Sequence, residues 1–319
     1  MLIDLALRLG SPAGPRQRLS ILIFHRVLPR PDTLHDDLPD AQRFDQLVGW
    51  LCRWFQVLPL DQAIRRLEDG SLPARAAAIT FDDGYADNLT VAVPVLQRHG
   101  VTATFFIAAS FLDGGRMWND TVAEALRICR ADHLDLRDLG LANYALTDPP
   151  ARRSALSSLL GHAKYLPQPE RQRLVDEIAQ RVGERLPDDL MMTTKQLLAL
   201  RDAGMQVGGH TLTHPILARI DDRQAREEIA GGKARLESIL GQHIELFAYP
   251  NGVPGRDYGR QHVEIIRQAG FRAAFTTAAG AAGRGSHLYQ MPRFTPWDRS
   301  RLRFGARMVR NLSVAEAVV

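Results

Sequence analysis

The sequence predicts an α/β protein in which parallel strands alternate with helices, and three observations support this fold class. Short apolar runs rich in β-branched residues recur along the chain, and segments with apolar residues at helical spacing separate them. Polar side chains follow directly after several of these runs, which is where parallel barrels place functional residues. A stretch of helical pattern, from about residue 116 to about 192, interrupts the alternation and is predicted to be an insertion.

The first part of the chain is predicted to contain four strands, at residues 20–24, 57–58, 76–81 and 102–107. Helices are predicted between them at residues 44–55, 60–67 and 88–97. Asp69-Gly70 and Gly100 end the second and third helices, because glycine accepts the left-handed conformation found at helix ends. Pro94 lies inside the third helix, where proline is expected to kink or break it.

The insertion is predicted to contain helices at residues 122–129, 151–160 and 171–182, and it is expected to cover the site. After it, the alternation resumes with helices at 194–203, 221–239 and 261–269. Strands are predicted at 205–208, 245–249, 271–275 and 289–294. The chain is therefore divided into an N-terminal segment (1–18), a main domain (19–300) and a C-terminal tail (301–319).

Composition narrows the function classes. The 319 residues are 45% hydrophobic and 24% charged, which fits a soluble protein with one large domain. The net charge of +4 comes from basic residues spread among acidic ones, so no nucleic-acid partner is expected. Cys52 and Cys129 lie in helical patterns and are predicted to be unpaired structural thiols.

The N-terminal apolar stretch is too short and too interrupted for a secretory signal. No run approaches the roughly 18 apolar residues of a transmembrane segment. A cytoplasmic location is expected, with a short amphipathic N-terminal helix touching a membrane surface as an alternative.

Two motifs carry the chemistry: Thr80-Phe81-Asp82-Asp83-Gly84 and His210-Thr211-Leu212-Thr213-His214. One carboxylate and two imidazoles suffice to hold a divalent metal with positions left open for water and substrate. The second carboxylate is then free to accept a proton from that water. Alone, Asp-Asp-Gly is also an ordinary turn, and the histidine pair is also compatible with a loop. Because both motifs follow predicted strands, together they indicate a metal-dependent hydrolase.

The motifs TFDDG and H-[ST]-x-x-H resemble the first two signature motifs of the polysaccharide deacetylase family, also called the NodB-homology family. The similarity extends from about Leu19 to about Thr295. It implies a distorted (β/α) barrel that removes N-acetyl or O-acetyl groups from sugars with a divalent metal. By position, it implies Asp82 as the catalytic base and, as the metal ligands, Asp83, His210 and His214. Zn²⁺ is the expected ion, with Co²⁺, Ni²⁺ and Fe²⁺ as alternatives.

The sequence departs from the family pattern at two places. Ala248 stands where many members have an arginine that orients the base, and the segment Met291–Phe294 lacks the late histidine that supplies the acid. Arg293 is expected either to replace the missing arginine in space or to form a structural salt bridge. His25, which follows the first strand, is the best candidate acid, since a subset of the family has a similar strand-then-histidine start. The alternative for His25 is a core histidine bonded to the backbone.

The expected substrate-binding residues lie at strand ends and at the start of the insertion: Tyr249, Pro250, Asn251, Arg293 and Trp118. Helix capping by Asn119 or Asp120 is the simpler interpretation of the segment around Trp118. The expected function is N-deacetylation of amino sugars in a saccharide, glycolipid or exopolysaccharide precursor. The alternatives are an O-acetyl esterase and a catalytically reduced saccharide-binding barrel, the latter suggested by Ala248 and the missing histidine. Neither the sugar nor the oligomeric state is predicted.

Overall fold

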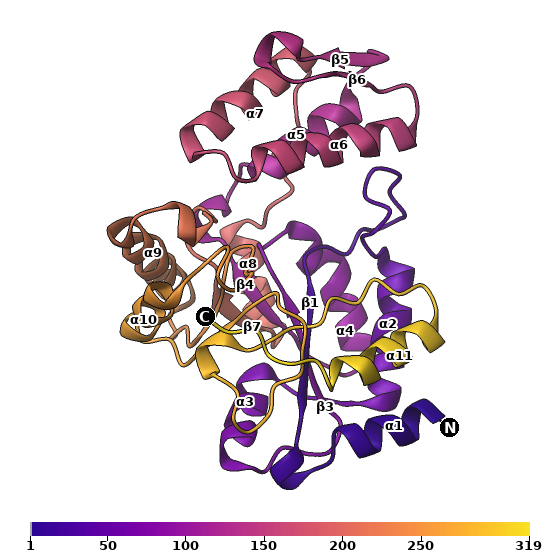
Figure 1. Ribbon diagram of the computed structural model, residues 1–319, viewed down its shortest axis with the longest axis vertical. Coiled ribbons are helices and arrows are strands. Elements are labelled where there is room, and N and C mark those ends of the chain that lie inside the picture. The colour runs from indigo at the N-terminus through magenta and orange to yellow at the C-terminus, as the bar shows by residue number, and fades with distance from the viewer. Residues whose placement is uncertain (1) are drawn as a thin grey trace.

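The computed structural model describes residues 2–319 and has a curled, parallel sheet at its centre (Figure 1). The strands lie in the order β1 (Leu19–Phe24), β3 (Ala76–Phe81), β4 (Thr104–Ile107), β7 (Gln206–Gly209), β8 (Leu246–Ala248) and β9 (Ala273–Phe275). The short strand β2 (Gln56–Val57) pairs with the first residues of β3. All of these pairs are parallel, which confirms the predicted α/β class.

The segment from residue 291 to 294 connects the two edges of the sheet. The amide of Met291 donates to the carbonyl of Ala274 on β9 at 2.9 Å, and the amide of Phe294 donates to Ile21 on β1 at 2.7 Å. The strand predicted at 289–294 is therefore only partly correct, because Leu288–Gln290 is a 3-10 helix and the pairing is limited to isolated bridges. These bridges close the curled sheet into the expected distorted barrel.

Side chains of the strands alternate between two cores, as the pleat requires. Ala76 and Ala78 point into the barrel interior with Phe106, whereas Ala77 and Ile79 face the outer helices. Gly208 leaves room for Phe106, since a Cβ there would lie 2.4 Å from its ring. The same alternation carries on past the strand ends, so the next inward positions direct side chains into the mouth of the barrel.

Helices cover the outside of the sheet: α2 (Ala41–Trp54), α4 (Val93–Arg98), α8 (Thr194–Asp202), α9 (Asp222–Leu240) and α10 (Arg260–Gln268). The buried residues of α3 (Leu60–Asp69) pack instead with those of the barrel interior. The helix predicted at 88–97 is a π-helical turn, Asn88–Ala92, followed by α4. Pro94 lies in the first turn of α4, directly after the π-helical turn, and has no backbone N–H that would need a partner there.

Two further helices lie near the ends of the chain. The helix α1 (Leu2–Gly10) contacts α11 (Arg301–Asn311), which lies in the segment treated above as a tail. Phe304 of α11 is fully buried and stacks on Trp54 of α2, with ring centroids 6.3 Å apart. The start of the C-terminal segment is therefore packed against the core.

Residues 116–192, called the cap below, stand above the barrel (Figure 1). The cap consists of α5 (Trp118–Ile128), a hairpin of β5 (His133–Asp135) and β6 (Asn143–Ala145), α6 (Pro149–Ala163) and α7 (Gln168–Val182). It has its own hydrophobic core, which Leu34 from the loop after β1 also enters. The hairpin was not predicted, because three-residue strands are too short to show a period of two.

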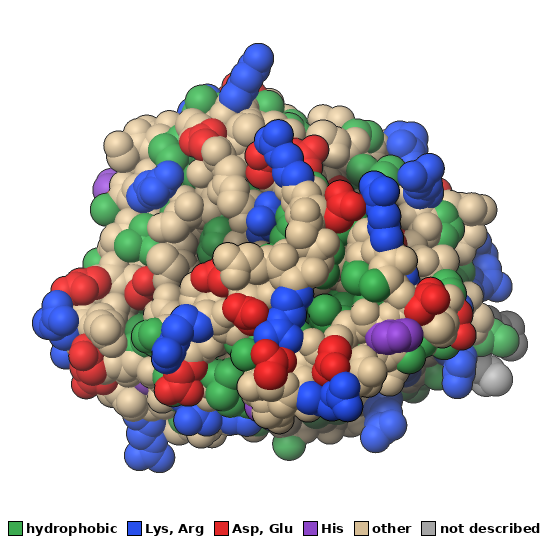
Figure 2. All heavy atoms as spheres, turned by 90° about the horizontal axis from the view of Figure 1, so that it is seen from above, with side chains coloured by type: hydrophobic (Ala, Val, Ile, Leu, Met, Phe, Trp, Pro, Cys, Tyr) green, Lys and Arg blue, Asp and Glu red, His purple; other side chains and the backbone are tan. Residues whose placement is uncertain are grey.

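Two other expectations can be compared with the structure. Cys52 and Cys129 are unpaired, as predicted. No helix within residues 2–319 is both long enough and apolar enough to cross a bilayer. Seen from above, the face of the cap carries basic and acidic side chains interspersed with one another (Figure 2).

Candidate active site

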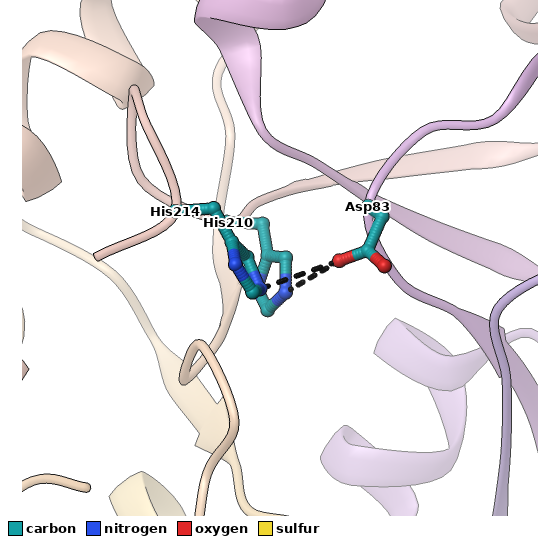
Figure 3. A group of neighbouring side chains, drawn as sticks. All are labelled: Asp83, His210 and His214. Atoms are coloured by element: carbon teal, nitrogen blue, oxygen red, sulfur yellow. Dashed lines mark ion pairs between the residues drawn. The ribbon is translucent and has the colours of Figure 1, made fainter. Parts of the chain in front are cut away.

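Asp83, His210 and His214 converge at the mouth of the barrel (Figure 3). Asp83 follows β3, and the two histidines lie on the loop after β7. Their potential ligand atoms all lie within 4.8 Å of one another. The Nε2 atoms of both histidines lie 3.3 Å from Oδ1 of Asp83. The structure thus brings together the three residues expected to bind a metal.

The chemistry of this cluster fits a divalent cation. Nδ1 of His210 lies 2.7 Å from the carbonyl of Ala248, which can only accept, so Nδ1 carries the hydrogen and the Nε2 lone pair faces Asp83. Oδ1 of Asp83 is buried and has no hydrogen-bond donor within residues 2–319. Lone pairs that face one another in a buried place need a positive charge between them. Two imidazoles and a carboxylate are a donor set that Zn²⁺ accepts.

Electrostatics keep Asp83 and His214 in forms that can bind a cation. For His210, burial alone would lower the pKa, but the neighbouring carboxylates of Asp83 and Asp82 outweigh it and raise the pKa. Burial alone would raise the pKa of Asp83, but the imidazoles of His214 and His210 outweigh it and hold the pKa well below its ordinary range. Burial lowers the pKa of His214 to about 4. At neutral pH the carboxylate is therefore ionised and His214 is neutral, as metal ligands must be.

The backbone around the cluster is strained. Asp83, Thr211 and His214 have positive φ values of 79°, 66° and 57°. Such conformations cost about 1–3 kcal/mol each, and they are especially unfavourable for a β-branched residue such as Thr211. Two consecutive amides of the histidine loop donate to Glu228 of α9 at 3.0 and 2.8 Å, and Oγ1 of Thr211 accepts from the amide of His214 at 3.1 Å. These bonds stabilise a loop conformation that points both imidazoles at Asp83.

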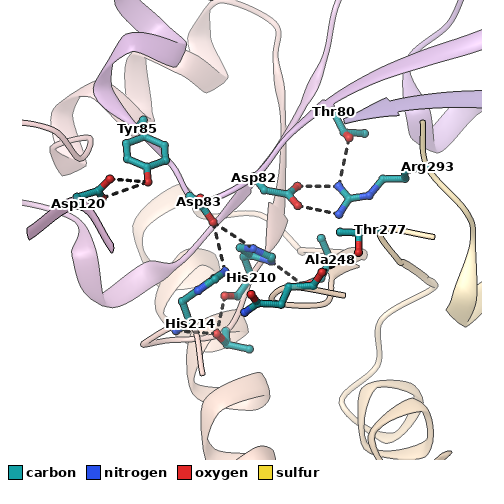
Figure 4. A network of polar contacts seen from close by, with 12 residues as sticks. Thr80, Asp82, Asp83, Tyr85, Asp120, His210, His214, Ala248, Thr277 and Arg293 are labelled. Carbon is teal, nitrogen blue, oxygen red and sulfur yellow. Dashed lines mark hydrogen bonds and ion pairs between the residues drawn. The ribbon is translucent and has the colours of Figure 1, made fainter. Parts of the chain in front are cut away.

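Asp82 lies beside this cluster and is bound by Arg293 (Figure 4). Nη1 and Nη2 of Arg293 donate to the two carboxylate oxygens, both at 2.7 Å, and its Nε donates to the carbonyl of Thr276 at 2.9 Å. The side chains of Arg293 and Asp82 are only 0% and 2% exposed. Burial alone would raise the pKa of Asp82, but the charge of Arg293 outweighs it and lowers the pKa. Asp82 is therefore ionised at neutral pH.

A cavity of about 520 Å³ lies over the two aspartates. Seven of the predicted residues line it: the two aspartates, His210 and His214, and also His25, Trp118 and Asn251. Sequence analysis missed other lining residues, which come from the cap and from the loops after β9: Met117, Asn119, Leu160, Gly161, Lys164, Thr277 and Thr295. A larger hollow of about 750 Å³ between the N- and C-terminal segments contains no comparable cluster of carboxylates and imidazoles.

The structure corrects three expectations about substrate contacts. Tyr249 is fully buried, its hydroxyl donates to the carbonyl of Tyr289 at 2.8 Å, and its ring stacks on Tyr258 at 3.7 Å. Pro250 is buried too, and neither residue lines the cavity. Arg293 was also expected to contact substrate, but its guanidinium donates to Asp82 and to the backbone carbonyl of Thr276 instead. His25, in contrast, is exposed and lines the cavity, so the alternative of a core histidine is wrong.

The expected helix capping by Asn119 or Asp120 is also wrong. The N-cap of α5 is Met117, and no side chain caps this end. Asp120 instead accepts a hydrogen bond from the hydroxyl of Tyr85 at 3.1 Å (Figure 4). Burial raises the pKa of Asp120 to about 7. This contact joins the cap to the loop that carries Asp83. In the sequence, the only indication of it is that Tyr85 lies two residues after Asp83.

Comparisons with known proteins agree with this fold. A family model described as polysaccharide deacetylase matches residues 69–134 and 174–274, just over half of the chain. The unmatched residues between these segments lie within the cap. YxkH of Bacillus subtilis (strain 168), a protein that carries the name polysaccharide deacetylase, is 20% identical over 278 residues, which cover 86% of this chain and 70% of YxkH.

Solved structures with the same fold include the deacetylase PplD of Streptococcus pyogenes in complex with acetate. It has a TM-score of 0.61 and 18% identity, and the alignment covers 93% of this chain and 99% of PplD. IcaB from Ammonifex degensii has a TM-score of 0.59 and 20% identity over 93% of this chain and 98% of its own.

Proposed function

Since the chain belongs to the polysaccharide deacetylase family of hydrolases, we propose that it is a metal-dependent N-deacetylase. Its substrate would be an amino sugar within a saccharide, glycolipid or exopolysaccharide precursor. One observation carries this proposal: a three-ligand cluster and a separate ionised carboxylate, Asp82, lie at the same cavity. Carbohydrate binding alone requires no carboxylate held in this way beside a metal site.

Asp83, His210 and His214 are the residues that would hold the ion, and Zn²⁺ is the first choice. When bound, the ion supplies Lewis-acid polarisation of the acetyl carbonyl and lowers the pKa of water. The orphaned Oδ1 of Asp83 and the fixed tautomer of His210 support this assignment.

Asp82 is the proposed general base. It is ionised, and its neighbour Asp83 occupies the ligand cluster while Asp82 does not. Arg293 binds both of its oxygens and thereby fixes the plane of the carboxylate. Arg293 therefore has the orienting role that the family pattern gives to an arginine at the position of Ala248.

His25 is the proposed general acid. Hydrolysis forms a bond between the water oxygen and the acetyl carbon and breaks the bond between that carbon and the sugar nitrogen. Asp82 accepts a proton from the water, and His25 donates one to the departing nitrogen, so the products are acetate and a free amino sugar. The exposed position of His25 in the wall of the cavity supports this role.

The remaining walls suit a sugar. Trp118 and Asn119 of the cap face the cavity together with Asn251 and Thr277 of the barrel, which offers one aromatic surface and several neutral hydrogen-bonding groups. A volume of about 520 Å³ lies within the ordinary range for small-molecule sites.

The test is acetate release from N-acetylglucosamine oligosaccharides by the protein loaded with Zn²⁺, before and after treatment with a chelator. His25→Ala should lose most turnover of the amide but much less turnover of an acetyl ester with a good leaving group, because such a group departs without protonation. Equal loss on both substrates would assign His25 a structural role. Release from O-acetylated sugars alone would make the protein an esterase, and no release from either would refute the hydrolase proposal.

A further inference from the structure

We propose that a second cavity beside the active site binds the sugar residue next to the one that is deacetylated, and that this neighbouring residue carries an anionic group. The inference rests on the proposed function, because it concerns the substrate of the same site. It defines the substrate as a saccharide of at least two units with a carboxylate or phosphate substituent.

The position of the second cavity supports a shared ligand. Its volume is about 500 Å³, close to that of the first cavity. Thr277 and Thr295 line both cavities, so these two side chains form a common partition. A substrate held with its acetyl group over Asp82 and Asp83 can therefore extend past the threonines into the second cavity.

Trp297 supplies an aromatic surface in this second cavity. It is 58% exposed, and the guanidinium of Arg307 lies 3.8 Å from the centre of its ring. Arg307 is itself held by Asp298 at 2.6 Å and by the carbonyl of Thr295 at 3.0 Å. The indole is thus fixed on one face while much of its surface stays open. A rigid aromatic surface in a polar cavity suits stacking against the C–H face of a pyranose.

The charge of the second cavity indicates what its ligand carries. No Asp or Glu lines it, whereas three arginines do. Arg293 is neutralised by Asp82 and Arg307 by Asp298. The exposed guanidinium of Arg310 makes no hydrogen bond or ion pair with any residue from 2 to 319. It lies three positions after Arg307 on α11, on the same side of the helix. An uncompensated cation next to a sugar-stacking surface favours a ligand with a negative group.

The experiment compares kcat/KM of the Zn²⁺-loaded protein on four substrates. They are a neutral N-acetylglucosamine disaccharide, an N-acetylglucosamine–uronic acid disaccharide, an N-acetylglucosamine disaccharide phosphorylated on its second sugar, and 4-nitrophenyl acetate. The variants are Arg310→Gln, Trp297→Ala and Trp297→Phe. Arg303→Gln is the matched control, because Arg303 is an exposed arginine of the same helix that does not line the cavity.

Arg310→Gln should lower kcat/KM about 10-fold on whichever anionic substrate the wild type prefers, mainly through KM, and less than 2-fold on the neutral disaccharide. Trp297→Ala should lower kcat/KM on all three disaccharides, and Trp297→Phe should retain most of the wild-type value. Hydrolysis of 4-nitrophenyl acetate should be unchanged in every variant. A preference for the uronic acid substrate or for the phosphate identifies the anionic group.

Two results would overturn the inference. One is equal loss on all four substrates, which would mean that Trp297 and Arg310 act on the fold. The other is wild-type kinetics in all variants, which would leave the proposed function intact without the second cavity. Calorimetry separates the two proposals further. If no saccharide releases acetate but the wild type binds the anionic disaccharide and Arg310→Gln does not, then the deacetylase proposal fails and the second cavity stands.

Discussion

Buried carboxylates need a counter-charge, and it can come from any part of the chain that the fold brings near. The arginine at residue 248 that the family pattern predicts is absent, but Arg293 reaches Asp82 from the segment that closes the barrel. Both residues continue inward-facing positions of their segments, Asp82 after Ala78 and Thr80, and Arg293 after Met291. The pairing thus follows from side-chain alternation and barrel closure together.

The ligands and the base should respond differently to substitution. Asp83→Ala and His214→Ala should each lose bound metal and activity together, because only two ligands remain. Asp82→Asn should keep the metal and lose roughly 100-fold or more of turnover, the scale of a lost general base. Metal analysis and acetate release on the purified variants check this, with His243→Ala as control, since that side chain is 94% exposed. A fully metal-loaded Asp83→Ala protein would contradict the ligand assignment.

Replacing Arg293 should change the pH profile as well as stability. Arg293 lowers the pKa of Asp82, and a base must be deprotonated to act, so in Arg293→Gln the pKa rises and the acidic limb of kcat/KM moves to higher pH. Arg293→Lys, which keeps the charge but not the two-pronged contact, should shift less. Loss of one partner from so buried a pair should also cost about 3–5 kcal/mol of unfolding free energy. An unshifted acidic limb in a folded Arg293→Gln protein would exclude Asp82 as the titrating base.

At the scale of elements, α9 determines where the histidine loop can lie. A Cβ at Gly232 would lie 2.7 Å from the carbonyl carbon and oxygen of Thr211, whereas one at Gly231 would meet only the end of the Leu212 side chain at that distance. Gly232→Ala should therefore displace the loop and weaken Zn²⁺ binding at least 10-fold. Gly231→Ala should bind Zn²⁺ normally, because a flexible side chain can move aside. Competition with a metal indicator measures both affinities, and equal affinities would show that the loop is not held by this contact.

The sequence predicts elements well where the pattern is long. The strand at residues 76–81 and the helix observed at Asp222–Leu240 were predicted to within one residue at each end, because six apolar or β-compatible residues and five helical turns are strong signals. The hairpin of β5 and β6 was not predicted, and the strand predicted at 289–294 is correct only in its closing segment, 291–294. Both owe their conformation to tertiary partners: the cap core for the first, and two strand edges for the second.

At the scale of the whole molecule, we expect the cap to contribute to saccharide binding and the barrel to carry the metal site and the hydrolytic groups. The two ends of the cap meet in space, because the amide of Asp113 donates to the carbonyl of Met192 at 3.1 Å. Residues 116–188 can be replaced with a short Gly-Ser linker, and Leu34→Ser then removes the apolar side chain that loss of the cap would expose. This variant should remain a folded, metal-binding barrel. Turnover of oligosaccharides should fall at least 10-fold, since Trp118 and Asn119 are lost, while 4-nitrophenyl acetate hydrolysis should persist. Loss of both activities with metal retained would show that the cap positions the catalytic groups themselves.

The site was predictable to the extent that its residues lie in local motifs. Asp82, Asp83, His210 and His214 lie in two short segments, and the structure places all four at one cavity. Trp118 was expected to contact substrate and Arg293 to replace the missing arginine, but the contributions of Thr277 and of the other cap residues depend on long-range packing, which a single sequence does not display. Tyr249 was misassigned because a strand end was expected to face the mouth, whereas its ring fills a gap against Tyr258.

The distance along the chain between Asp82 and Arg293, 211 residues, has a consequence for biosynthesis. A ribosome releases both signature motifs long before it releases the arginine, so the growing polypeptide holds a carboxylate that it cannot yet bury. Contacts between residues so far apart in sequence form late, since a long loop must first be closed. In refolding from denaturant, helical circular dichroism should therefore recover before acetate release does, and simultaneous recovery would contradict this order. A chain that ends before the closing segment at 291–294 would therefore contain both motifs but lack the arginine that binds Asp82.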